Sequence, residues 1–182
     1  MHYSRHRRAV WFLSAISFAE SSFFPVPPDV MLAPMCLGSP KKAWHYALIT
    51  TLCSVAGGLL GYAIGFLAID TIMPYLDTSS YHDTYLKAVS IFDEWGFWAL
   101  FVAGFSPIPY KVFTIAGGAA SMPLLPFVLA SLIGRGARFF LVAGLMAWGG
   151  EKMENYLHRI VDRLGWVMVV VLTIAVLIKI YN

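Results

Sequence analysis

Two long apolar segments, residues 44–69 and 124–148, are the feature that most constrains how this chain folds. Each is long enough to cross the hydrocarbon core of a bilayer, which takes about 20 residues. Of all 182 residues, 59% are hydrophobic and 13% are charged, whereas soluble domains carry about 25% charged residues. A soluble domain of this size could not bury so much apolar surface. We therefore expect an all-helical integral membrane protein, and exclude a soluble enzyme, a disordered chain and a nucleic-acid-binding module.

Four further segments complete the predicted order of elements. Residues 9–40 and 97–120 are apolar but interrupted near their middle, and residues 164–181 form a last apolar span. Residues 78–94 are polar, with apolar side chains at three- and four-residue spacing. This spacing predicts an amphipathic helix lying at the membrane surface. All of these elements belong to one predicted membrane domain, residues 1–182.

Prolines interrupt both of the broken segments. Proline removes a backbone donor and clashes with the preceding helical turn, so closely spaced prolines end a helix. Bare backbone cannot face lipid, and each break must be buried in protein or line a wet cavity. The pattern favours two re-entrant helical hairpins whose tips meet, and two kinked spanning helices are the alternative. The predicted breaks lie at Pro25, Pro27, Pro28, Pro107 and Pro109.

Basic residues around the first hairpin predict an inverted repeat. An excess of lysine and arginine marks cytoplasmic segments, and both ends of the hairpin carry them, so the N-terminus is expected in the cytoplasm. The span that follows leaves the acidic segment outside, and the second hairpin then enters from the opposite face. Many secondary transporters use this architecture to place a site at the membrane midplane. The flanking basic residues are Arg5, Arg7, Arg8, Lys41 and Lys42.

Five charged residues fall inside the apolar segments. A charge at the bilayer centre costs about 2.5–3.5 kcal/mol on insertion scales, and such residues mark substrate or ion paths. Asp29 follows the first proline break and Lys111 follows the second, so the two side chains are expected to pair if the hairpin tips meet. Such a pair either fixes the packing of the hairpins or responds to protons or substrate. The five residues are Glu20, Asp29, Lys111, Arg135 and Arg138.

These charges predict a proton relay beside a phosphate site. A low dielectric favours the neutral form of a carboxyl group, so Glu20 and Asp29 are the candidate proton carriers. For Glu20 a hydrogen bond between helices is the alternative. Arg135 and Arg138 share a helix face, and a planar guanidinium binds phosphate oxygens in pairs. Together with Lys111 they are the candidates for binding a lipid phosphate. Alternatively, one or both arginines neutralise the carboxylates, for which a phosphate could compete.

Other residues indicate packing rather than chemistry. Gly57, Gly61 and Gly65 lie four residues apart within segment 44–69, and small residues at this spacing let helices approach closely. Cys36 and Cys53 lie in apolar stretches and are expected as buried thiols. The sequence contains no nucleophile–base motif, metal-ligand spacing or phosphate-binding loop. We therefore expect neither an enzyme nor a bound metal or cofactor.

Several motifs resemble those of the DedA family of membrane proteins, in the SNARE-associated or VTT superfamily. Glu20 followed by Pro25-Val26-Pro27-Pro28-Asp29 is similar to the family's E-x(n)-P-x-P-[ED] element. Gly57-x-x-x-Gly61-Tyr62-x-x-Gly65 is similar to its G-x-x-x-G-Y-x-x-G element. The run from Gly104 to Lys111 is similar to its G-R-F-x-P-x-x-R element. The sequences F-S-P-I-P-Y-K and G-R-G-A-R-F-F, at residues 105–111 and 134–140, most resemble the YqaA-like branch.

The resemblance implies a fold of two opposed re-entrant hairpins and a flippase or scramblase that depends on the proton motive force. The implied location is the bacterial inner membrane. Phe105 and Lys111 stand where the family motif has arginine, and lysine is not equivalent to arginine at a bidentate phosphate site. Arg135 and Arg138 are the candidates to supply the missing groups.

The expected function is therefore translocation of a phosphate-bearing lipid, such as a phospholipid or a polyprenyl phosphate. The expected partners are membrane lipids and protons, with no nucleic acid, and self-association into a homo-oligomer stays open. Two other functions stay open as well. One is proton-coupled transport of a small ion or solute, and the other is a non-transporting role in organising membrane proteins.

Overall fold

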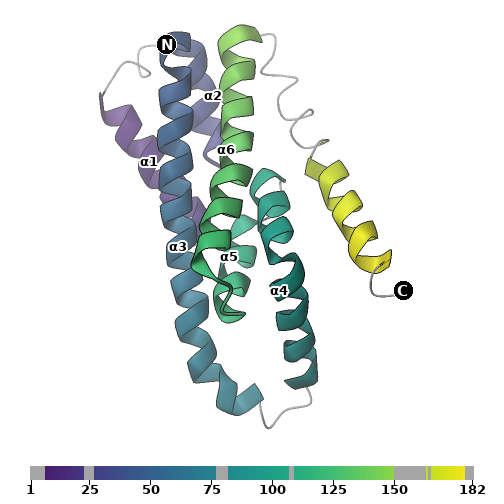
Figure 1. Ribbon diagram of the computed structural model, residues 1–182. Helices are drawn as coiled ribbons and strands as arrows, with labels where there is room; N and C mark the ends of the chain where they lie inside the picture. The colour runs from purple at the N-terminus through teal and green to yellow at the C-terminus, as the bar shows by residue number, and fades with distance from the viewer. Residues whose placement is uncertain are drawn as a thin grey trace.

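The computed structural model describes residues 7–22, 27–76, 82–106, 109–149, 163 and 165–178. These residues are helical almost throughout and contain no strand (Figure 1). The first half of the chain comprises α1 (Arg7–Ser22), α2 (Asp29–Gly38), the short 3₁₀ helix η2 (Pro40–Lys42) and α3 (Ala43–Leu76). The second half comprises α4 (His82–Phe105), α5 (Tyr110–Ala119) and α6 (Leu124–Gly149), followed by a C-terminal helix, Gly165–Ile178.

Two of the described helices are long and apolar enough to cross a bilayer: Pro40–Pro74, which includes most of α3, and α6. They correspond to the spans predicted at residues 44–69 and 124–148, and α3 continues further, to Leu76. Large apolar side chains such as Leu67 and Leu125 are exposed on these helices, a surface suited to hydrocarbon rather than to water. The C-terminal helix is shorter than a full span over the residues described.

Helices α2 and α5 each begin directly after a proline. Pro28 is the N-cap residue of α2 and Pro109 is that of α5, and neither N-terminus has a side-chain cap. Proline suits this position because its ring fixes the backbone and its missing N–H is not needed there. Pro27 precedes α2 in the described chain, whereas Pro25 and Pro107 lie outside the described residues.

The start of α4 differs from the prediction. A separate surface helix was expected over residues 78–94, but a single helix runs from His82 to Phe105. No proline separates Glu94 from Phe97, so nothing removes the hydrogen bonds that continue the helix there. The polar first turns of α4 therefore lead directly into its apolar half.

The two halves of the chain pack in a reciprocal way. Helix α1 packs against α3, and α4 packs against α6; α2 packs against α6, and α5 packs against α3. Exchanging the first three α-helices with the last three therefore reproduces these four pairings, which together with the α3–α6 contact are the most extensive among the described helices. In Figure 1, α1 runs from one end of the bundle to about the mid-height of α3, and α4 reaches that height from the opposite end.

A polar layer divides the buried core along α6. Toward the end of this helix, Phe139 and Val142 belong to an apolar cluster with residues of α1, α2 and α3. Toward its start, Phe127 belongs to a second cluster with residues of α4 and α5. Between these clusters α6 carries Arg135 and Arg138. The fold thus places two arginines between two apolar cores.

Glycines of α3 allow its close contacts with two other helices. A Cβ atom at Gly57 would overlap the carbonyl oxygen of Phe18 in α1, and one at Gly65 would overlap that of Ile115 in α5. A Cβ atom at Gly61 would overlap the hydroxyl of Thr114 in α5. The three glycines therefore lie where α3 is in close contact with α1 and α5, and none of these positions has room for a larger side chain.

We expect Gly65→Ala to lower the free energy of unfolding by about 1–3 kcal/mol, because the added methyl group must displace the backbone of α5. Gly136→Ala in α6 is the matched control, since its Cβ would lie 3.7 Å from Cγ2 of Thr51, an ordinary contact. Alanine there is expected to be neutral or slightly stabilising. Denaturant unfolding in detergent micelles compares the two variants, and equal stability would contradict the close α3–α5 contact.

Candidate functional site

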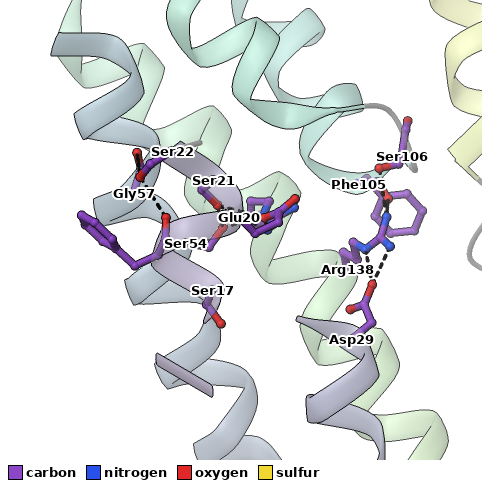
Figure 2. Close-up of polar contacts among 12 residues, drawn as sticks. Ser17, Glu20, Ser21, Ser22, Asp29, Ser54, Gly57, Phe105, Ser106 and Arg138 are labelled. Atoms are coloured by element: carbon purple, nitrogen blue, oxygen red, sulfur yellow. Dashed lines mark hydrogen bonds and ion pairs between the residues drawn. The ribbon is translucent and has the colours of Figure 1, made fainter. Parts of the chain in front are cut away.

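Two buried ion pairs join α6 to the first half of the chain. Arg135 pairs with Glu20 near the end of α1, and Arg138 pairs with Asp29, the first residue of α2. Arg135 is 3% exposed and Asp29 is 5% exposed. Figure 2 shows Glu20 and Asp29 in two separate groups of polar side chains. A charge buried in this way needs a partner of opposite charge and good hydrogen bonds.

Arg138 connects the start of α2 to the end of α4. Its Nε and Nη2 atoms both donate to Oδ2 of Asp29, at 3.1 and 2.5 Å. Its Nη1 atom donates to the carbonyl oxygens of Phe105 and Ser106, at 3.1 and 2.9 Å. The cation thus lies at the negative end of the α4 dipole, while Asp29 lies at the positive end of α2, and both placements are favourable. Figure 2 shows this group around Arg138.

The second oxygen of Asp29 has a different environment. Oδ1 is buried and accepts no hydrogen bond from the described residues, although its neighbour Oδ2 accepts two. Arg138 therefore holds the carboxylate through one oxygen only. The arrangement leaves Oδ1 as the oxygen that a proton can occupy without displacing a hydrogen bond from a described residue.

Arg135 is held by three other helices. Its Nε atom donates to Oγ of Ser54 in α3, at 2.6 Å, and its Nη2 atom donates to Oε2 of Glu20 in α1. Its guanidinium carbon lies 5.0 Å from the ring centre of Tyr110 in α5 and 4.7 Å from that of Phe139. Both distances are typical of cation–π contacts. Arg135 and Arg138 together therefore contact the end of α1, the start of α2, the end of α4 and the start of α5.

The expected partner of Asp29 was wrong: it pairs with Arg138 rather than with Lys111. Reciprocal packing explains the difference, because α2 packs against α6 whereas α5 packs against α3. The first turn of α2 therefore brings Asp29 to Arg138 of α6, whereas α5 packs mainly along α3. Lys111 is partly buried in the first turn of α5, directly after Tyr110. The structure agrees with the alternative in which both arginines neutralise carboxylates, because each forms an ion pair with one of them.

Sequence reasoning missed Ser21, Ser54 and Tyr110. Both serines are 0% exposed, and their hydroxyl oxygens lie 2.6 Å apart. Polar side chains inside spanning helices form hydrogen bonds between helices. The signal was present in the sequence as a serine next to Glu20, a serine within segment 44–69 and a tyrosine next to Lys111.

The site offers guanidinium donors, carboxylates and hydroxyl groups in an apolar bundle. Such a set can exchange one anion for another on an arginine and can bind protons on the carboxylates. Among the residues that the structure describes, no group of three or more His, Cys, Asp or Glu side chains is placed to hold a metal ion.

Comparison with known proteins identifies the family. The VTT domain matches residues 26–148. An uncharacterized protein from Haemophilus influenzae is 50% identical over 175 residues, which cover 96% of this chain and 91% of that protein. An uncharacterized homolog from Histophilus somni is 44% identical over 178 residues, covering 98% and 93%. No solved structure gives a significant match. The chain therefore belongs to the VTT domain family, the DedA family of membrane proteins.

Proposed function

We propose that this protein translocates a phosphate-bearing lipid, such as a phospholipid or a polyprenyl phosphate, across the bacterial inner membrane. Membership of the VTT family supports a membrane transport or lipid-related role in general. The observation that carries the specific proposal is the bonding of Arg138, whose Nε and Nη2 atoms both meet one oxygen of Asp29. This edge of a guanidinium is the one that binds phosphate oxygens in pairs.

The proposed mechanism requires a membrane arrangement with two re-entrant units, α1–α2 and α4–α5. Helices α2 and α5 have ten residues each, about 15 Å at 1.5 Å per residue, which is half of the hydrocarbon core. The reciprocal packing of the two halves supports an inverted repeat whose units enter from opposite faces. The exposed lysines Lys41 and Lys42 favour the cytoplasm for the end of the bundle where α2 ends and α3 begins.

Proton binding on Asp29 starts the proposed cycle. In the ion-paired state Asp29 occupies the Nε–Nη2 edge of Arg138. A proton on Oδ1 neutralises the carboxylate and weakens both of these hydrogen bonds, because the Coulombic attraction between the carboxylate and the guanidinium is lost. Glu20, whose side chain is 18% exposed, is the more accessible carboxylate and acts as the second proton carrier.

The lipid phosphate then takes the place of Asp29 on Arg138. The Nη1 atom stays on the carbonyl oxygens of Phe105 and Ser106, which keeps the plane of the guanidinium fixed during the exchange. Lys111 at the start of α5 adds a second positive charge for the headgroup. Loss of the proton toward the other side of the membrane restores the ion pair and releases the lipid, so the proton motive force drives the cycle. No covalent bond changes, and the protein acts as a transporter rather than as an enzyme.

Transport by the purified protein in proteoliposomes tests this proposal. We expect labelled phospholipid or polyprenyl phosphate to change leaflets faster than in empty vesicles, and an imposed proton gradient to increase the rate. Asp29→Asn is expected to keep lipid movement but to lose the effect of the gradient, because the amide neither takes up nor releases a proton.

Asp70→Asn is the matched control, since Asp70 is exposed on α3 outside the polar layer and its replacement should leave the gradient effect intact. A gradient effect that survives in Asp29→Asn contradicts the proposed coupling. A proton-coupled flux of a small ion or solute without lipid movement would instead support transport of that ion or solute.

A further inference from the structure

Four side chains, Arg135 and three around it, form a closed ring of hydrogen bonds. Arg135 donates from Nε to Ser54 and from Nη2 to Glu20. The hydroxyl groups of Ser54 and Ser21 lie 2.6 Å apart, and Ser21 donates to Oε2 of Glu20 at 3.1 Å. The ring joins α1, α3 and α6, and both serines are 0% exposed.

The donor and the acceptor of each hydrogen bond in this ring can be assigned in only one way. A guanidinium has no acceptor, so Oγ of Ser54 must accept from Arg135 and has its own proton to give. Ser21 gives its proton to Glu20, so Ser54 donates to Ser21. Followed from donor to acceptor, the hydrogen bonds run from Arg135 through Ser54 and Ser21 to the Glu20 carboxylate, which also accepts directly from Arg135. Arg135 also donates from Nη2 to Oγ of Ser21, at 3.4 Å. Of its two bonds that do not involve Glu20, the one to Ser54, at 2.6 Å, is much the shorter.

The two arginines differ in what they lose when their carboxylate becomes neutral. Among the described residues, the Nε–Nη2 edge of Arg138 bonds to one oxygen of Asp29 and to nothing else. The same edge of Arg135 is shared among Glu20, Ser54 and, at 3.4 Å, Ser21. Two aromatic rings also cover the guanidinium. Neutralising Glu20 therefore leaves Arg135 attached to α3, whereas neutralising Asp29 releases a complete edge of Arg138.

We propose that Ser54 is a positioning residue that holds Arg135 on α3, so that Arg138 alone exchanges its carboxylate for the lipid phosphate. This inference rests on the proposed lipid transport. One exchanging guanidinium binds the phosphate loosely enough to release it, whereas two would bind it with additional charge-assisted hydrogen bonds and slow its release. Ser54 thus sets the balance between binding and release.

The test compares Ser54→Ala with Ser17→Ala. Ser17 is the matched control because it is also 0% exposed, but among the described residues its hydroxyl bonds only to the carbonyl oxygen of Leu13, within α1. In proteoliposomes we expect Ser54→Ala to lower both the KM for the lipid and the kcat about tenfold, as the freed Nε of Arg135 joins the phosphate site. Ser17→Ala should keep both constants.

Hydrogen exchange at Nε of Arg135 gives a second readout that does not require transport. Its NMR signal in nanodiscs is assigned by its loss in Arg135→Lys, and we expect exchange in Ser54→Ala to be at least tenfold faster than in Ser17→Ala. Equal exchange and an unchanged KM in the two serine variants would overturn the inference. If the wild-type protein moves no lipid, the proposed function fails, and hydrogen exchange alone decides whether Ser54 holds Arg135. Faster hydrogen exchange at Nε in Ser54→Ala then supports this role. Equal hydrogen exchange in the two serine variants overturns it.

Discussion

Replacing Arg138 by lysine is expected to reduce lipid transport by about two orders of magnitude while keeping the positive charge. Arg138 uses Nη1 for two backbone carbonyl oxygens and its Nε–Nη2 edge for Asp29. A lysine ammonium is a single point charge and cannot serve both sets of acceptors in this geometry. Loss of two charge-assisted hydrogen bonds to the phosphate, each about 1.5–3 kcal/mol, corresponds to at least a hundredfold effect at about 1.4 kcal/mol per factor of ten.

The measurement is the initial rate of leaflet exchange at matched amounts of folded protein, with folding checked by thermal unfolding in micelles. Arg163→Lys is the matched control, because Arg163 is exposed and the same substitution there should leave the rate unchanged. A folded Arg138→Lys protein with wild-type transport would show that the bidentate edge plays no part in substrate binding. Rates that fall equally in the two variants would point to a general effect of removing arginine.

Much of the helical order follows from composition and proline placement. The segments predicted as spans, residues 44–69 and 124–148, are helical as parts of α3 and α6, and both helices are long and apolar enough to cross a bilayer. The starts of α2 and α5 follow Pro28 and Pro109 directly. The separate helix over residues 78–94 was wrong because polarity changes along α4 without any residue that ends the helix. Periodicity shows which face of a helix is apolar, but not where a helix ends.

The members of the site were easier to predict than their partners. Charges inside apolar segments identified Glu20, Asp29, Arg135 and Arg138, since each is too costly to place there without a role. Their pairing depends on which long helix each short helix packs against, and adjacency in the sequence does not contain that information. Asp29 was matched with Lys111 because both follow proline breaks, whereas α2 packs against α6 and brings Asp29 to Arg138. Ser54 was missed because a lone serine in a span carries no charge.

Removing Arg135 alone is expected to destabilise the protein by about 3 kcal/mol, because Arg135→Ala leaves the Glu20 carboxylate without its counter-ion. It also leaves Ser54 and Ser21, both fully buried, without the donor that orders their hydroxyl groups. Glu20→Leu is expected to cost less, since Arg135 would keep Ser54 and the rings of Tyr110 and Phe139. Denaturant unfolding in mixed micelles measures both losses.

The double variant Glu20→Leu with Arg135→Met separates the ion pair from the fold. Replacing a buried pair by apolar side chains of similar volume is often neutral or stabilising, so we expect the double variant to be more stable than Arg135→Met alone by at least 1 kcal/mol. If the two substitutions lower the free energy of unfolding additively, the two side chains stabilise the protein independently. Glu20 would then have other partners that stabilise it as much as Arg135 does. If the double variant recovers stability but not transport, the ion pair takes part in the transport cycle. A pair that only fixed helix packing could be replaced without loss of either stability or transport.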